Sequence, residues 1–208
     1  MVQKNQVKAR GRPKSYDRST AIRAMRDLFW EKGYAATTLD DLSHVTQMNR
    51  PSLYNAFGDK AQIFKVILDD YVSEIRPLYE AAFKSGGSLF ETLTAVYETA
   101  YEIYLVHDKG LGCFLIGAAL TDSMRDPEIA HLILDRIHAI DRGFVWLMKS
   151  AQEKGQLPSG VDPGAMAMLA SSIHNAISVR VRAGENLQDL RAYVNSMVKL
   201  LVSQPRLS

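Results

Sequence analysis

The chain has 208 residues, enough for one large domain or for a small domain joined to a larger one, and its 47% of hydrophobic residues is ordinary for a globular protein with an apolar core. No stretch approaches the roughly 18 consecutive apolar residues of a membrane-spanning helix, and the first residues lack the apolar segment of a secretory signal. Cys113 is the single cysteine, which excludes an intrachain disulfide and favours a reducing, cytoplasmic location.

Basic side chains are concentrated at the N-terminus. Residues 1–18 carry a net charge of +5, so the other 190 residues carry −3. A basic arm beside a mildly acidic body indicates a polyanion bound at one end, although such termini are also common as solvated tails. Residues 10–14 read RGRPK, and such an extended segment is thin enough for the DNA minor groove, where Arg10 and Arg12 would favour narrow A·T-rich DNA. This motif is weak by itself.

Two helical patterns follow the arm. Apolar side chains at steps of three and four residues predict a helix over 17–32, which Gly33 ends. The hydroxyl groups of Thr37 and Thr38 are suited to cap a second helix. The apolar face of that second helix consists of Leu39, Leu42 and Val45.

A turn over 46–49 leads to a third helix. Asn49 is a good N-cap, and Pro51 suits the first turn because its missing N–H would have no partner there. Leu53 and Phe57 point inward at a four-residue step. The side chains left for solvent or DNA are Arg50, Ser52, Tyr54 and Asn55. Together the second and third helices predict a helix-turn-helix.

Six further helices and no strand are predicted in the rest of the chain, so the predicted fold is all-α. Pro77 is expected to kink or split the first of these helices. The helix over 112–122 is apolar nearly all round, so we expect it to be buried. The expected ranges are 59–83, 88–107, 112–122, 127–154, 163–184 and 186–202.

Residues 17–64 resemble the DNA-binding head of the TetR (tetracycline-repressor) family of bacterial transcription regulators. The spacing Leu-Tyr-x-x-Phe-x-x-Lys, from Leu53 to Lys60, is the specific part of the match. The chain departs from the family at Thr46-Gln47, where Ala-Gly is usual, and at Pro51, where Gly is common. The other residues that carry the match are Leu28-Phe29, Gly33-Tyr34, Thr37-Thr38, Leu42, Ser52, Asn55-Ala56 and Phe64.

The resemblance implies a three-helix head on a larger six-helix body. It implies a basic arm over 1–16, a helix-turn-helix domain over 17–64, and an effector-binding and dimerisation domain over 65–208. The third helix would enter the major groove, where Arg suits guanine and Asn suits adenine. Expected base-reading residues are Arg50, Ser52 and Asn55. Expected phosphate-contacting residues are Thr38, Tyr54 and Lys60, and the expected DNA-binding set also includes Thr37, Asn49, Arg10 and Arg12. Tyr54 packed on the first helix and Asn55 as an ordinary exposed polar residue remain alternatives.

The resemblance further implies a homodimer on a palindromic operator. The helices over 163–184 and 186–202 are the expected dimer surface, since the first is rich in small residues and the second in apolar ones; internal packing is the alternative. The expected interface residues are Ala167, Ala170, Ser171, Val194, Met197 and Leu201.

The body of this family holds a small effector, and the apolar residues here favour a hydrophobic one. Ordinary core packing is the alternative for each residue in that region. The candidate lining residues are Tyr79, Phe83, Tyr97, Tyr101, Phe114, Met124, Phe144, Trp146, Met148 and His174.

Other kinds of site find little support in the sequence. Cys113 is a candidate redox or electrophile sensor, or an inert cysteine of an apolar helix. His131 and His138 lie two helical turns, roughly 10 Å, apart and cannot ligate one ion, so we predict no metal site and no cofactor. No phosphate-binding loop or nucleophile motif appears, which argues against an enzyme. A DNA-binding regulator without an effector and a helical adaptor remain alternatives.

Overall fold

The computed structural model describes residues 17–106, 109–122, 124, 126–158 and 160–203. These residues form nine α-helices and one short two-stranded ladder, which confirms the all-α prediction. The basic arm, with Arg10 and Arg12, lies outside the described residues. Within the described part, no helix is both long and apolar enough to cross a membrane.

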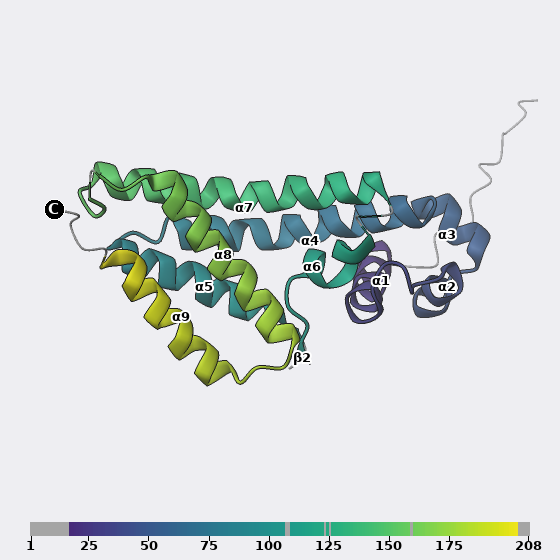
Figure 1. Cartoon of the computed structure of the whole chain (residues 1–208). Coiled ribbons are helices and arrows are strands. Elements are labelled where there is room, and N and C mark those ends of the chain that lie inside the picture. The colour runs from purple at the N-terminus through teal and green to yellow at the C-terminus, as the bar shows by residue number, and fades with distance from the viewer. Residues whose placement is uncertain (1–16, 107–108, 123, 125, 159, 204–208) are drawn as a thin grey trace, which may run out of the picture.

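Three helices form the head at one end of the molecule (Figure 1). They are α1 (Arg18–Lys32), α2 (Leu39–Thr46) and α3 (Arg50–Phe57). Each begins at a polar N-cap whose side chain accepts a hydrogen bond from a backbone N–H of the first turn, namely Asp17, Thr38 and Asn49. The boundaries agree with the predicted ones because these caps are encoded within four residues of chain.

A long helix, α4 (Lys60–Phe83), runs from the head into the body (Figure 1). Its start is a capping box in which the Asp59 side chain accepts from Gln62 N–H, and Gln62 Oε1 accepts from Asp59 N–H. Pro77 lies inside α4, so of the two expected effects, a kink or a split, the split does not occur. Buried residues on both sides of Pro77, among them Tyr71 and Tyr79, keep the helix packed against the body across the proline.

Five helices complete the body around α4. They are α5 (Leu89–Tyr104), α6 (Phe114–Ala119), α7 (Pro127–Glu153), α8 (Pro163–Arg182) and α9 (Leu187–Val202), with a 3₁₀ turn over Leu120–Asp122 after α6. Helix α7 lies along α4, α8 crosses the body, and α9 lies far from the head (Figure 1).

The connection between α5 and α6 differs from the predicted one. Helix α5 ends at Tyr104 instead of continuing to about 107, and β1 (Leu105–Val106) pairs antiparallel with β2 (Lys109–Gly110). The prediction that the chain has no strand was therefore wrong at this hairpin, which two-residue strands make invisible to a periodicity argument. Helix α6 is also shorter than predicted, beginning after Cys113 instead of at 112.

Aromatic side chains join the head to the body. Phe114 of α6 packs edge-on against Trp30 of α1, at 5.4 Å between ring centroids, and stacks on Phe64 of α4 at 5.6 Å. Tyr34 N–H donates to the Ala118 carbonyl at 2.6 Å, directly after α1. The head is therefore packed on α4 and α6 as part of one continuous core.

Arg182, the last residue of α8, adds a polar link between the body and α1. Its guanidinium donates to the backbone carbonyls of Leu111, at 2.9 Å, and Trp30, at 3.3 Å. Gly117 leaves the room for this guanidinium, because a Cβ at that position would overlap it. The end of α8 is thus tied to the end of the head's first helix.

Candidate nucleic-acid interface and buried polar cluster

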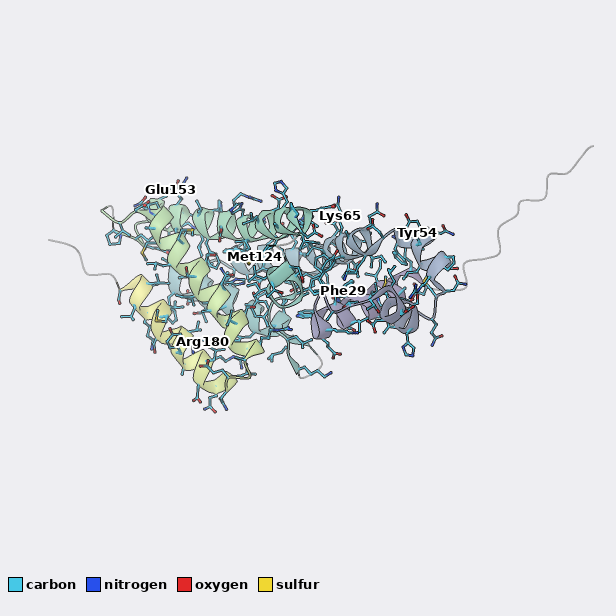
Figure 2. The ribbon with its side chains drawn as sticks, turned by 45° about the vertical axis from the view of Figure 1, so that its right-hand side comes forward. Phe29, Tyr54, Lys65, Met124, Glu153 and Arg180 are labelled. Carbon is cyan, nitrogen blue, oxygen red and sulfur yellow. The ribbon has the colours of Figure 1, made fainter. Side chains whose placement is uncertain are left out.

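Helix α3 is anchored on one face and free on the other. Leu53 and Phe57 are buried, as predicted. Tyr54 is 63% exposed at the outer end of the head, so it does not pack on α1, and Ser52 and Asn55 are exposed beside it (Figure 2). The structure therefore brings three of the predicted DNA-contacting side chains onto one open helix surface.

Arg50, at the start of α3, makes an ion pair that local periodicity did not indicate. Its Nε donates to Asp40 Oδ1 at 2.6 Å, and its second guanidinium nitrogen donates to Asp40 Oδ2. The guanidinium holds the pKa of the Asp40 carboxyl below its ordinary value. Both side chains are exposed, so the pair fixes the direction of Arg50 at the surface instead of burying it.

The turn between α2 and α3 depends on a left-handed residue. Gln47 has φ 55°, and it is the only non-glycine residue with positive φ among the described residues. This is the position at which the chain departs from the glycine usual in the resembling family. A side chain there costs roughly 1 kcal/mol, which the buried Met48 and Leu42 beside the turn offset.

Two of the predicted DNA contacts serve the fold. Thr37 is 1% exposed and its hydroxyl donates to the Gly33 carbonyl at 2.6 Å, so the expectation that its side chain contacts DNA was wrong: the hydroxyl closes the end of α1. Asn49 is exposed, and its Oδ1 accepts from Ser52 N–H at 2.9 Å as the N-cap of α3.

The side chains of Thr38, which is exposed, and Lys60, which is half-buried, each form a hydrogen bond within the protein. The Thr38 hydroxyl donates to Asp41 Oδ2 at 2.7 Å in the α2 capping box. The Lys60 ammonium donates to the Thr37 carbonyl at 2.9 Å and lies 4.4 Å from the Tyr34 ring centroid, where partial burial lowers its pKa. Both groups lie beside the α1–α2 connection, and their contact with phosphate stays a prediction.

Comparison with known proteins places this head in a family. Residues 21–67 match the family described as bacterial regulatory proteins, tetR family. The HTH-type transcriptional repressor ComR of Escherichia coli (strain K12) is 30% identical over 194 residues, which cover 93% of this chain and 92% of ComR. The chain belongs to the tetR family of bacterial regulatory proteins. It is a DNA-binding regulator of transcription.

Two further proteins match over most of the chain. The HTH-type transcriptional repressor BdcR of E. coli (strain K12) is 26% identical over 194 residues, covering 92% of each chain. The fold matches that of the TetR family transcriptional regulator CifR, solved as a cysteine mutant with a 26bp double-strand operator DNA. The TM-score is 0.83 at 24% identity, over 93% of this chain and 100% of CifR. These relatives are regulators, not enzymes.

In the tetR-family body, most of the predicted pocket residues are buried together. Phe144 of α7 contacts Phe83, Tyr97 and His174, with ring centroids 5.2, 6.2 and 6.0 Å apart. Tyr79 and Phe114 are buried in the same core, as is Met148.

One predicted pocket residue lies on the surface, and two others border cavities at the edge of this core, Trp146 together with Phe83 and Tyr101 together with Tyr97. Met124 is 92% exposed, so the prediction was wrong there: the chain has left α6 and lies in the connection to α7 (Figure 2). Trp146 is half exposed and borders a shallow cavity of about 160 Å³ near the end of α7. Tyr101 borders a groove of about 350 Å³ between α5 and α9, beneath the guanidinium of Arg191.

A polar cluster lies in the same core. Tyr79, one of the predicted pocket residues, and Tyr104 place their hydroxyl oxygens 2.8 and 3.1 Å from His174 Nε2, and Tyr71 is buried nearby on α4. Helical spacing puts 71 and 79 near the same face of α4, but the meeting with α5 and α8 depends on tertiary packing.

Most of the predicted dimer residues face inward. Ala167, Ala170 and Ser171 of α8 are buried, as are Val194 and Leu201 of α9, so the expectation that they form the subunit interface was wrong for these five. Packing within one subunit covers them, since the Ser171 hydroxyl donates to Asp141 of α7. Met197 is half-buried. The exposed apolar residues of these helices are Met168, Leu169, Val179, Tyr193 and Leu200.

Cys113 is the N-cap residue of α6 and is half-buried. Its backbone N–H donates to the Ser178 hydroxyl of α8 at 2.8 Å. Desolvation raises the pKa of the thiol above its ordinary value, which disfavours the reactive thiolate that a sensor needs. In the part of the chain described here, no three His, Cys, Asp or Glu side chains are placed to hold a metal ion.

Proposed function

We propose that this protein is a homodimeric repressor that binds a palindromic operator through α3 and the basic arm. It leaves the operator when a small effector binds within the body. The observation that carries the proposal is the exposed face of α3, with Ser52, Tyr54 and Asn55 presented by the buried pair Leu53 and Phe57. The cytoplasm is the compartment in which such a regulator meets its operator.

On the DNA, Arg50 and Asn55 read base edges while Tyr54 and Lys60 hold phosphates. Arg suits the two acceptors of guanine, and Asn suits the acceptor and donor of adenine. The arm adds Arg10 and Arg12 in the neighbouring minor groove. One head of this size covers few base pairs, so two heads on a palindrome supply the required specificity.

The dimer is supported by exposed apolar side chains on two helices that pack on each other, α8 and α9. Leu169 and Val179 of α8 and Leu200 of α9 are each at least half exposed, and Met168 and Tyr193 of the same helices are exposed as well. Exposed apolar side chains of this size favour an association surface, and two helices from each subunit would form a four-helix bundle there.

The first test is selection of bound DNA from a random pool, followed by binding of the selected site. Arg50→Ala and Asn55→Ala should each relax base preference, while Arg142→Ala on the exposed face of α7 makes the same charge change as Arg50→Ala and should leave preference intact. Unchanged selectivity in both head variants would remove their assigned roles.

A second measurement separates the arm from the head. Deleting residues 1–14 should weaken binding and flatten its dependence on salt concentration, because fewer phosphate counterions are released. If the protein without residues 1–14 keeps the wild-type dependence on salt concentration, the arm is a solvated tail that does not contact phosphate.

Sedimentation tests the dimer. Leu169→Glu and Leu200→Glu should shift the protein to monomer, and a wild-type monomer at micromolar concentration would contradict the dimer.

A further inference from the structure

Three polar aromatic side chains meet inside the body, and a fourth, Tyr71, lies within electrostatic range of two of them, Tyr79 and Tyr104. Tyr71 and Tyr79 come from α4, Tyr104 from α5 and His174 from α8, and none is more than 8% exposed. The hydroxyl oxygens of Tyr79 and Tyr104 both lie within hydrogen-bond distance of His174 Nε2, at 2.8 and 3.1 Å. We call these four residues the tyrosine–histidine cluster.

The cluster leaves polar atoms without partners. His174 Nδ1 and the Tyr71 hydroxyl are both buried and form no hydrogen bond of ordinary geometry among the described residues, although the Asn175 side chain lies near His174 and the Phe114 N–H lies near the Tyr71 oxygen. In addition, Nε2 of a neutral imidazole carries either one lone pair or one hydrogen, so it cannot accept from both tyrosine hydroxyls. Buried groups of this kind destabilise a protein relative to phenylalanine at the same positions, so their presence calls for a partner.

The missing partner is a hydrogen-bond acceptor. Burial lowers the pKa of His174 to about 4 and raises the pKa of Tyr79 and Tyr104 above the ordinary value. At physiological pH the cluster is therefore neutral and holds three O–H groups and one imidazole N–H. Tyr79 and Tyr104 are hydrogen-bonded to each other, so one hydroxyl donates to the other and the second donates to His174 Nε2. The Tyr71 O–H then remains as a buried donor without an acceptor.

Aromatic rings surround the cluster. The Phe144 ring lies 6.0 Å from the His174 ring, and the Phe114 ring lies 5.3 Å from the Tyr71 ring. Aromatic rings of this kind suit the flat apolar part of a ligand, while the hydrogen-bond donors suit a single oxygen atom on that ligand. The surrounding rings and the donors together therefore indicate a small molecule with an apolar ring and one oxygen acceptor.

Tyr71 also connects the cluster to the head. Its ring packs edge-on against Trp30 of α1 at 5.4 Å, and the Trp30 carbonyl accepts from Arg182. Because the unpartnered atoms are enclosed, a ligand can reach them only when the packing around them opens. When Tyr71 shifts against Trp30, the packing of α1 on the body changes. A ligand that binds only this shifted state increases the fraction of molecules that adopt it.

We propose that the effector is a small, flat molecule carrying a carbonyl oxygen, as a ketone, aldehyde, amide or carboxylic acid, bound by the tyrosine–histidine cluster. The oxygen accepts from Tyr71 and from the imidazole or hydroxyl donors, and the apolar part lies among the aromatic rings. The effect on DNA rests on the proposed function, whereas binding of the molecule does not.

The test uses the full chain and matched compounds. Acetophenone, benzaldehyde, benzamide and benzoic acid are compared with ethylbenzene and toluene at equal concentration, by thermal unfolding and by tryptophan fluorescence, which Trp30 beside Tyr71 reports. We expect the oxygen-bearing compounds to raise Tm and change the fluorescence, and the hydrocarbons to do neither. The pattern among the four identifies the carbonyl class.

Two tyrosine variants separate recognition from stability. Tyr71→Phe and Tyr101→Phe each remove a buried hydroxyl without a hydrogen-bond partner, but Tyr101 lies at the α5–α9 groove outside the cluster. Tyr71→Phe should weaken binding of the carbonyl compound about tenfold, the worth of one hydrogen bond, and Tyr101→Phe should leave it unchanged. Both variants should fold as well as the wild type, because each loses an unsatisfied group.

Three results would overturn the inference: hydrocarbons that raise Tm as much as the carbonyl compounds, no response to any compound of the panel, or equal binding by Tyr71→Phe and the wild type. Retention of the selected operator is measured separately. A carbonyl compound that binds without releasing DNA leaves this inference standing and removes effector release from the proposed function. If the protein recognises the operator but binds no compound of the panel, this inference fails and operator binding in the proposed function stands.

Discussion

In the head, polar side chains stay at the surface and find partners within one helical turn, as Asn49 does with Ser52 N–H and Thr38 with Asp41. In the body, polar groups from three helices meet in the interior, and His174 and Tyr71 keep atoms without a partner. Surface groups that are already oriented can contact a large, charged partner without rearrangement. Buried, incompletely satisfied groups suit a small molecule that the protein must open to admit. The two regions therefore differ in what they recognise and in how much they must move.

The largest effect on stability is expected at Phe114, the residue that packs the head on the body. Phe114→Ala removes a fully buried ring that contacts Trp30, Phe64 and Tyr71, and should destabilise the protein by about 3–5 kcal/mol. Denaturation followed by tryptophan fluorescence and by circular dichroism should give one coincident transition in the wild type and in the variant. Two separate transitions would show that head and body unfold independently.

The second prediction concerns the pH dependence of the body. His174 has a pKa of about 4 when folded, against an ordinary 6.5, so the unfolded state binds the extra proton between these values. Its contribution to stability is complete above about pH 6.5 and is lost as pH falls towards 4, by roughly 3 kcal/mol in all.

Urea denaturation between about pH 5 and pH 7.5 measures this loss in the free energy of unfolding. The range lies above the pH at which the head carboxylates Asp40 and Asp41 take up protons. His174→Gln should flatten the dependence, and His138→Gln, on the exposed face of α7, should keep it. A dependence of wild-type size in His174→Gln would assign it to another group.

The third prediction concerns the Arg50–Asp40 ion pair on the head. Asp40→Asn frees the Arg50 guanidinium and removes a negative charge beside the DNA-facing surface. We expect tighter binding to DNA of any sequence, because repulsion of phosphate is lost, together with weaker preference for the selected operator.

Asp135→Asn makes the same charge change on the exposed face of α7 and serves as the control. If Asp40 were only a surface charge without a positioning role, affinity would rise with no loss of selectivity.

The smallest expected effect lies in the turn. Gln47→Gly relieves the left-handed backbone at φ 55° but makes the unfolded chain more flexible, so a net stabilisation of at most about 1 kcal/mol is expected. The midpoint of chemical denaturation measures it, and a destabilised variant would mean that the Gln47 side chain stabilises the turn by more than the strain it causes.

Local sequence by itself determined the head and most helix boundaries. Asn49 with Ser52, Asp59 with Gln62 and Ser88 with Glu91 are caps whose partners lie three residues apart, so the chain encodes them without reference to the rest of the fold. The inward pair Leu53 and Phe57 follows from a four-residue step in the same way. The exposure of α3 follows from these local features.

Only the tertiary structure decided which neighbour covers each helix face. The small residues Ala167, Ala170 and Ser171 could have faced a second subunit, but packing within the subunit buries them, and Met124 lies on the surface because α6 ends before it. The Arg50–Asp40 pair and the cluster around His174 join residues from different helices. Helical periodicity tells which side chains share a face, but the partner of that face is set by the packing of the whole chain.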